Sequence, residues 1–306
     1  MKNTDKEKKH NRIRLAVQIF FAAVFNGYAK GFTRGIIFDG GTKRFCVPVL
    51  NCYSCPGALG ACPIGAMQAV ATGSKRNFSF YAFGIIILFG VVLGRFICGF
   101  LCPFGLIQDL LAKIPLPKIN VPKKLDKALR LLKYVLLVFF VMLLPAVVTN
   151  EFGMGDPWFC KYICPAGTLE GGIPLIASNS FLRDTLGALF TWKAILLGLV
   201  VIGSIFIKRF FCRYLCPLGA LYSLFNKFSF YTMSVDKEKC VGCGKCEEKC
   251  PMAVDVTKNI NSAECIRCGK CKAACPTQAI FSGLRLKGNN SIIDKSGESK
   301  TNNQSV

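Results

Sequence analysis

Histidine is almost absent from this sequence, which contains only His10. Haem b held between helices needs axial histidines, and c-type haem is attached at a Cys-x-x-Cys-His run, so the sequence supports neither cofactor. No Gly-x-Gly-x-x-Gly follows a predicted strand, which leaves a bound nicotinamide or FAD domain without support. His10 lies in a polar N-terminal segment, and we expect it to be a solvated surface residue.

Acidic residues are also scarce, since 17 Asp and Glu accompany 39 Lys and Arg, for a formal net charge of +22. Such a charge is typical of nucleic-acid-binding proteins. However, the chain has no basic recognition helix, and many of its lysines and arginines flank long apolar stretches. We therefore expect no nucleic-acid partner. The apolar stretches also lack the buried acids and histidines of proton and ion pumps.

What the sequence has in abundance is apolar residues, at 52% of 306 positions, with a mean hydropathy of +0.41. This is too apolar for an ordinary soluble protein of this size. Three stretches are long enough to span a membrane, and a fourth, at 14–32, is weaker because it carries Gln18, Asn26 and Lys30. We favour spanning over an interfacial amphipathic segment there. The four predicted spans are residues 14–32, 78–97, 131–148 and 186–207.

Charge around these spans predicts their orientation. The segment before the first span and the loop between the second and third are basic, so both are expected on the cytoplasmic side. The loop between the third and fourth spans is richer in acids and is expected outside. The loop between the first two spans is basic as well, so its outside placement depends on helix parity. We expect a multi-pass plasma-membrane protein with a cytoplasmic C-terminal domain, in which Lys133 and Lys193 snorkel to the interface.

Eight of the eighteen cysteines form two copies of one run, Cys-x2-Cys-x2-Cys-x3-Cys-Pro. This spacing is typical of bacterial two-cluster ferredoxins, in which the fourth cysteine of each run ligates the other 4Fe-4S cluster. Structural zinc and disulfides fit these triplets less well. The predicted ligand sets are Cys240, Cys243, Cys246 and Cys275 for one cluster, and Cys265, Cys268, Cys271 and Cys250 for the other.

An internal repeat provides a third candidate site. Residues 95–113, RFICGFLCPFGLIQDLLAK, and residues 209–227, RFFCRYLCPLGALYSLFNK, are identical at nine of nineteen positions. In each copy an apolar span is followed by a Cys-x3-Cys-Pro-x-Gly motif and an amphipathic segment. Cysteines four apart on one helical turn direct two thiolates at the same object, so two copies complete a four-thiolate site. The predicted inner set is Cys98, Cys102, Cys212 and Cys216.

The opposite side carries six further cysteines for a fourth site. Cys62-Pro63-Ile64-Gly65 and Cys164-Pro165-Ala166-Gly167 are a fainter echo of the repeat. We expect the outer set to be Cys55, Cys62, Cys160 and Cys164. Cys52 is the closest rival to Cys55, and Cys46 is the expected spare. A Cys46–Cys52 disulfide on an oxidising outer face remains an alternative.

With these motifs in place, the chain resembles the NapH and NosR type of membrane-bound polyferredoxin over roughly residues 12–280. The resemblance implies a four-helix membrane protein that passes electrons between quinol or a cytoplasmic donor and a partner reductase. The expected fold is mainly α, with a transmembrane bundle of two repeated hairpins followed by a small α+β ferredoxin domain. The expected domains are residues 12–230 (membrane), 235–281 (two-cluster ferredoxin) and 282–306 (disordered tail).

The expected function is electron transfer through two 4Fe-4S clusters in the ferredoxin domain and two more in the membrane domain. The chain would serve as a component of an oxidoreductase system, with redox proteins as the expected partners and a quinone as an alternative partner. Two alternatives remain. One is an assembly or maturation factor that reduces a metal or thiol on a client, using Cys46 and Cys52 as reactive thiols. The other is a quinol dehydrogenase subunit.

Overall fold

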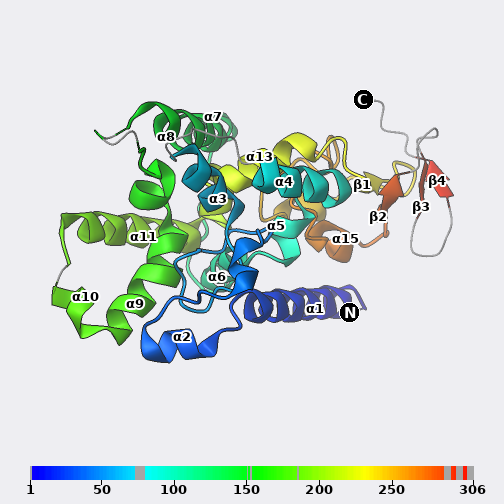
Figure 1. The fold of residues 1–306 in the computed structure, drawn as a ribbon. Helices are drawn as coiled ribbons and strands as arrows, with labels where there is room; N and C mark the ends of the chain where they lie inside the picture. Colours follow the sequence, from blue (N-terminus) through cyan, green and yellow to red (C-terminus); the bar gives the residue numbers. More distant parts are fainter. Residues whose placement is uncertain are drawn as a thin grey trace. The chain divides into compact units, whose positions relative to one another are not determined.

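The computed structural model describes residues 2–72, 80–149, 151, 154–184, 186–285, 291–293 and 299–301. The chain is mainly helical (Figure 1). It divides into two compact units. We call Ile19–Ile86 with Leu101–Leu221 the helical unit, and Met1–Gln18 with Ile87–Phe100 and Tyr222–Val306 the sheet unit. Each unit is described by itself.

The helical unit holds the end of α1 and the start of α4 and α13, together with thirteen further helical segments among the described residues. Three of these, η2, η3 and η4, have wider π-helical backbone. The thirteen segments are α2 (Ala29–Arg34), η1 (Gly41–Arg44), α3 (Pro63–Ala71), α6 (Pro103–Leu111), α7 (Lys123–Val135), η2 (Leu136–Leu143), α8 (Leu144–Val147), η3 (Phe159–Ile163), η4 (Gly167–Gly172), α9 (Ile173–Ser178), α10 (Ser180–Asp184), α11 (Ala188–Phe206) and α12 (Phe210–Tyr214).

The sheet unit pairs its strands in the order β1-β2-β3-β4, all antiparallel, with Met233 of β1 opposite Ser282 of β2. Its elements are α1 (Lys2–Phe25), α4 (Phe80–Leu93), α5 (Phe96–Phe100), α13 (Pro217–Phe225), β1 (Tyr231–Val235), α14 (Lys245–Glu248), α15 (Lys270–Ala274), β2 (Ile280–Arg285), β3 (Ser291–Ile293) and β4 (Ser299–Thr301). The expectation of a disordered tail from residue 282 is wrong for the described part, because its backbone pairs into β2, β3 and β4. The rest of that tail lies outside the described residues.

Two helices among the described residues are long and apolar enough to cross a membrane. They are Lys123–Val147, which runs through α7, η2 and α8, and Ala188–Phe206, which is α11; each has a mean hydropathy of 2.1. They correspond to the third and fourth predicted spans. The apolar helix α4 has only 14 described residues and stops at Leu93. The span expected at 14–32 instead belongs to a helix that starts at Lys2 and ends at Phe25. The four-span bundle therefore remains a prediction.

The internal repeat is visible in the local backbone of both copies. In each copy a residue with positive φ, Gly94 (φ 58) or Arg209 (φ 55), lies in the turn after the long apolar helix. A five-residue helix, α5 or α12, then carries the first cysteine, and a nine-residue helix, α6 or α13, begins at the proline. The second cysteine precedes that proline, and Cys102 has extended backbone. The two cysteines of a pair therefore do not share one helical turn as expected.

Candidate metal centres

The Cys-Pro-x-Gly sequence builds a helix start that turns backbone N–H groups toward the cysteine sulfur. Cys62 and Cys102 are the N-cap residues of α3 and α6, with proline at the first helical position, where a missing N–H costs nothing. The N–H of Gly219 donates to the Cys216 Sγ at 3.3 Å. Backbone N–H groups of the motif glycines likewise reach Cys62 and Cys164. Such hydrogen bonds stabilise a thiolate and tune a cluster bound to it.

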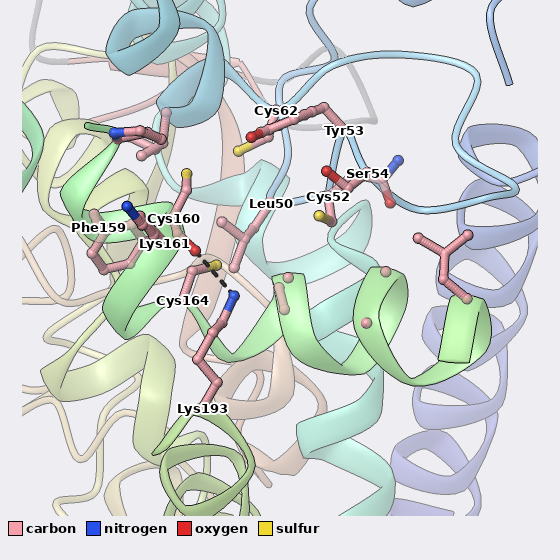
Figure 2. Close-up of a pocket in the computed structure, with 18 of the residues that line it drawn as sticks. Leu50, Cys52, Tyr53, Ser54, Cys62, Phe159, Cys160, Lys161, Cys164 and Lys193 are labelled. Atoms are coloured by element: carbon pink, nitrogen blue, oxygen red, sulfur yellow. Dashed lines mark hydrogen bonds between the residues drawn. The ribbon is translucent and has the colours of Figure 1, made fainter. Parts of the chain in front are cut away.

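A cavity of about 360 Å³ in the helical unit gathers four cysteines. Figure 2 shows Cys160 and Cys164 on one segment and Cys52 and Cys62 on another, facing the same space. A Cβ added to Gly167 would lie 3.8 Å from the Cys52 Sγ, at ordinary van der Waals distance, so the motif glycine lies close to this sulfur. Four sulfur donors around one cavity are the donor set that a 4Fe-4S cluster requires.

The structure brings Cys52 to this cavity rather than Cys55. Cys55 is buried nearby in sequence but does not line the cavity, and its Sγ lies 3.5 Å from the Asn26 Oδ1. Cys46 is also outside the cavity lining, and its backbone bridges to Ala61. All eighteen cysteines are free, so the alternative Cys46–Cys52 disulfide is not observed.

Polar side chains that the sequence patterns do not indicate contact the cysteine segments of this cavity. The Gln68 Oε1 accepts the Cys160 N–H at 3.2 Å, and a Glu170 carboxylate oxygen accepts the Cys52 N–H at 2.8 Å. Lys193 lines the cavity and donates from Nζ to the Cys160 carbonyl at 3.2 Å. The snorkelling expected of Lys193 stays a prediction, because this hydrogen bond does not place its ammonium group relative to a membrane interface.

Burial and neighbouring thiols disfavour free thiolates in this cavity. Burial raises the pKa of Cys164 to about 12, and burial followed by the charge of Cys164 raises the pKa of Cys52 and Cys160. Burial also raises the pKa of the Glu170 carboxyl to about 7. Thiols in such a place become thiolates when a metal binds, because coordination replaces the proton.

The expected inner set is divided between the two units. Cys102, Cys212 and Cys216 belong to the helical unit and Cys98 to the sheet unit. In the helical unit, Gln108 is 1% exposed, and its Nε2 donates to the Cys212 Sγ at 3.1 Å. Its Oε1 accepts the Cys212 N–H at 3.4 Å and the N–H of the preceding residue at 3.1 Å. This amide therefore fixes both the backbone and the sulfur of Cys212.

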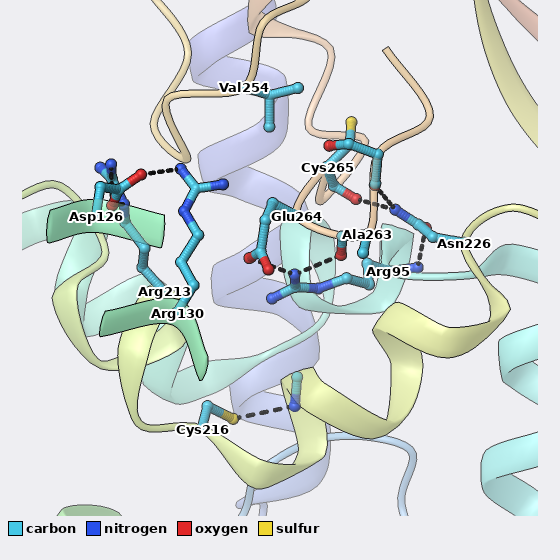
Figure 3. A network of polar contacts seen from close by, with 12 residues as sticks. Arg95, Asp126, Arg130, Arg213, Cys216, Asn226, Val254, Ala263, Glu264 and Cys265 are labelled. Carbon is cyan, nitrogen blue, oxygen red and sulfur yellow. Dashed lines mark hydrogen bonds and ion pairs between the residues drawn. The ribbon is translucent and has the colours of Figure 1, made fainter. Parts of the chain in front are cut away.

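Buried ion pairs hold the segment around Cys212 in the helical unit. Asp126 of α7 accepts hydrogen bonds at 2.7 Å from Arg213 and from the Tyr214 hydroxyl, and it also pairs with Arg130 (Figure 3). The Arg209 guanidinium is fully buried and pairs with Asp109 of α6 at 2.5 Å. The short helix α12 is thus tied to two neighbouring helices by charge.

In the sheet unit, the two predicted ferredoxin ligand sets each line a separate cavity. One cavity is lined by Cys240, Cys243, Cys246 and Cys275, and the other by Cys250, Cys265, Cys268 and Cys271. The spacing of the two runs therefore brings the crossed sets together. We call the first group the distal set and the second group the proximal set.

The sheet unit also places Cys98 against the proximal set. Cys98, Cys250 and Cys265 pack against one apolar cluster that includes Cys268. A Cβ on Gly99 would lie only 2.5 Å from the Ile266 carbonyl, so helix α5 can approach this loop because residue 99 is glycine.

Within the sheet unit, helix α1 contacts the segment that carries Cys98 and the loop that carries Cys268. The His10 Nε2 donates to the Cys268 carbonyl at 2.9 Å, and the Arg14 Nε donates to the Gly99 carbonyl at 3.0 Å. The expectation that His10 is a solvated surface residue is wrong, because its ring is half-buried beside the cysteine loop. Residues four apart share a helix face, so one side of α1 makes both contacts.

A second polar network of the sheet unit fixes the end of the proximal loop. Figure 3 shows Asn226, which donates to the Cys265 carbonyl at 2.8 Å and accepts the Arg95 N–H at 3.1 Å. The Arg95 guanidinium, fully buried, pairs with Glu264 at 3.1 Å. The repeat arginines 95 and 209 thus have the same role, each pairing with a carboxylate inside its unit.

Among the residues that the structure describes, no three cysteine, histidine, aspartate or glutamate side chains form a site for one metal ion. A tetrahedral zinc site needs sulfurs roughly 3.8 Å apart, given zinc–sulfur bonds of about 2.3 Å. In a 4Fe-4S cube each thiolate binds a different iron, so its four sulfurs stand farther apart.

Family models match both units of the chain. The 4Fe-4S binding domain matches residues 60–81, 78–122, 134–173 and 189–230. The 4Fe-4S dicluster domain matches residues 232–276, which contain both ferredoxin runs. The matched segments define the chain as an iron–sulfur protein. No solved structure matches it significantly.

Relatives agree with these models. The chain is 32% identical over 178 residues to the uncharacterized protein MJ0750 of Methanocaldococcus jannaschii, covering 58% of this chain and 66% of that protein. It is 30% identical over 220 residues to "Putative electron transport protein YccM" of Escherichia coli, covering 67% and 57%. It is 28% identical over 159 residues to the regulatory protein NosR of Stutzerimonas stutzeri, covering 50% and 19%. The chain spans at most 66% of the length of these relatives. It is a polyferredoxin-like protein of the NapH and NosR type.

Proposed function

We propose that this chain is a membrane-bound iron–sulfur protein that carries electrons between a cytoplasmic donor and a quinone or an extracytoplasmic acceptor. One observation carries the proposal: three separate cavities, two in the sheet unit and one in the helical unit, are each lined by four cysteines. Bound 4Fe-4S groups would supply the one-electron chemistry. The residues of the chain hold and insulate these groups and form no bond with a substrate.

The proposed ligand sets follow from the cavities and, for the inner site, from the sequence repeat. The outer site uses Cys52 in place of the expected Cys55, because Cys52 lines the cavity and Cys55 does not. The proposed sets are distal Cys240, Cys243, Cys246 and Cys275; proximal Cys250, Cys265, Cys268 and Cys271; inner Cys98, Cys102, Cys212 and Cys216; and outer Cys52, Cys62, Cys160 and Cys164.

The packing of the sheet unit supports an order for the ferredoxin centres. Cys98 shares an apolar cluster with the proximal cysteines, whereas Cys243 of the distal set is exposed. Electron transfer slows steeply with distance, so the distal centre would accept electrons from a reduced, low-potential ferredoxin-type donor. The proximal centre would then pass them one at a time to the inner centre, each step oxidising one centre as it reduces the next.

Two apolar helices and the relatives favour placing the helical unit in a membrane. With four spans, the basic segments would lie on the cytoplasmic side together with the ferredoxin centres. The outer cavity would then lie near the opposite face, where a quinone or a partner protein could collect the electrons.

The maturation-factor alternative gains no support from the geometry. Burial raises the pKa of Cys46 to about 11, which keeps this thiol protonated and poorly nucleophilic at neutral pH. Cys52, the second thiol that this alternative needs, lines the outer cavity with three other cysteines.

Anaerobic purification of the full chain, followed by iron and sulfide quantitation with EPR, tests the proposal. We expect four clusters, or roughly sixteen iron atoms per chain. A count near eight would leave only the ferredoxin centres and would overturn the role of the membrane cysteines. Reduction by a reduced ferredoxin supports the cytoplasmic donor, whereas reduction by quinol alone would favour the quinol dehydrogenase reading.

A further inference from the structure

The Cys-Pro-x-Gly motif occurs four times in the chain. The residue six positions after its cysteine is polar in each copy. We call this the +6 position. It is occupied by Gln68 after Cys62, Gln108 after Cys102, Glu170 after Cys164 and Tyr222 after Cys216. Three of these four residues carry a side-chain carbonyl or carboxylate oxygen.

Each of those three oxygens accepts the backbone N–H of a cysteine in a distant segment. Gln68 binds the Cys160 N–H at 3.2 Å, 92 residues away in the chain. Gln108 binds the Cys212 N–H at 3.4 Å, 104 residues away. A motif from one half of the helical unit thus reaches a cysteine of the other half.

Glu170 makes the third contact in the opposite direction along the chain. Its Oε2 accepts the Cys52 N–H at 2.8 Å, 118 residues away. The Cys52 N–H and the Cys160 N–H are therefore bound in the same way, each by a +6 side chain. This shared contact indicates independently that Cys52 pairs with Cys62 as Cys160 pairs with Cys164. The same reading gives Cys55 no equivalent contact, since its sulfur faces Asn26.

We propose that the +6 residues Gln68, Gln108 and Glu170 are positioning residues for the cluster ligands whose N–H groups they accept. A fixed acceptor holds the peptide plane of the ligand cysteine and therefore the direction of its Cα–Cβ bond. The two glutamines are at most 1% exposed, and Gln68 is itself anchored by donating to the Phe140 carbonyl at 2.7 Å. Partners of metal ligands act in this way in other metal sites. The inference rests on the proposed function, because it requires clusters at these cysteines.

Gln108 has a further contact that predicts a spectroscopic effect. Its Nε2 donates to the Cys212 Sγ at 3.1 Å, and a hydrogen bond to a ligand sulfur raises the reduction potential of a cluster. Replacement by glutamate keeps the oxygen acceptor but removes this donor. Gln108→Glu is therefore expected to keep the inner centre and lower its midpoint potential.

The test compares variants of the full chain, purified anaerobically in detergent, by EPR-monitored chelator challenge and redox titration. In Gln68→Leu and Glu170→Leu we expect the outer centre to be removed at least about tenfold faster than in wild type, and in Gln108→Leu the inner centre. Glu170→Gln retains an acceptor oxygen, so we expect the chelator to remove its outer centre at the wild-type rate. The ferredoxin centres serve as the internal reference for cluster content, and Glu170→Gln controls for folding of the helical unit.

Thr168 provides a matched control on the same helix as Glu170. Its hydroxyl is buried without a hydrogen-bond partner in the described part of the chain, so Thr168→Val should leave removal of the outer centre unchanged. If the wild type holds four clusters and the leucine variants lose them no faster than Thr168→Val, the positioning role is overturned while the proposed function stands. If the wild type holds only the two ferredoxin clusters, the membrane-domain part of the proposed function fails first.

Discussion

At the scale of single residues, we expect opposite effects on the outer cluster from replacing Cys52 and Cys55, although the two cysteines are three positions apart. Cys52 lines the outer cavity, and Cys55 is buried against Asn26. Cys52→Ser is expected to lose the outer cluster, about a quarter of the iron, because one ligand of four is missing. Cys55→Ser, the matched control, is expected to keep it. Iron quantitation with EPR on both variants tests which cysteine is the ligand. Loss of the outer cluster in Cys55→Ser alone would contradict the assignment of Cys52.

The same residues show how much of the site the sequence could predict. The ferredoxin cysteines follow a spacing rule, and the structure gathers them in the two expected groups. The choice between Cys52 and Cys55 depends on the path of an irregular loop, which no periodicity describes. The +6 residues were missed because their contacts span about a hundred residues, although their common distance from Cys-Pro-x-Gly was readable. The contact of His10 could not be predicted, because the polarity of its own segment does not indicate a hydrogen bond to the distant Cys268 carbonyl.

At the scale of elements, the ion pairs of Asp126 join α7 to α12. The Asp126 and Arg213 side chains are 11% and 8% exposed, and Asp126 also accepts the Tyr214 hydroxyl. Asp126→Ala leaves a buried guanidinium without its carboxylate, which costs about 3–5 kcal/mol. We expect a clearly lower thermal unfolding midpoint in detergent than for Lys127→Ala, an exposed control on the same helix. Equal midpoints for the two variants would show that this contact does not hold α12.

A second prediction at this scale concerns the contact between helix α1 and helix α5. Arg14 is buried and binds the Gly99 carbonyl beside Cys98, while Arg12 on the same helix is exposed. Arg14→Gln is expected to slow electron exchange between the proximal and inner centres on the order of tenfold, because α5 loses a fixed contact. Freeze-quench EPR after mixing with a reduced donor measures this rate. Arg12→Gln is the control, and equal rates in the two variants would remove α1 from the electron path.

The elements themselves were only partly predictable. Hydropathy located the apolar helices that correspond to the third and fourth predicted spans, since long apolar runs are a strong feature. It could not show that α4 ends at Leu93, where Gly94 adopts positive φ, or that α1 begins at Lys2. These boundaries depend on tertiary contacts, such as the hydrogen bond from Arg14 to the Gly99 carbonyl. Such contacts stabilise a helix through charged residues, which a hydropathy profile counts against a membrane span.

At the scale of the whole molecule, the proposed centres form a path only if electrons can enter at one face of the membrane and leave at the other. The ferredoxin centres alone would accept electrons but could not deliver them across a bilayer. A functional test must therefore separate reduction of the chain from transfer through it, and the outer cavity provides the means, because its four cysteines belong to the helical unit.

We expect the full chain in sealed vesicles to reduce trapped ferricyanide when a membrane-impermeant reductant is added outside. Only molecules whose ferredoxin domain faces the reductant would contribute. Cys52→Ser is expected to abolish this transfer while the ferredoxin centres still become reduced, because only the outer centre is lost. Cys55→Ser should transfer at the wild-type rate. Ferricyanide reduction at the wild-type rate in Cys52→Ser vesicles would mean that electrons leave the chain before reaching the outer cavity, and a transmembrane path through it would be excluded.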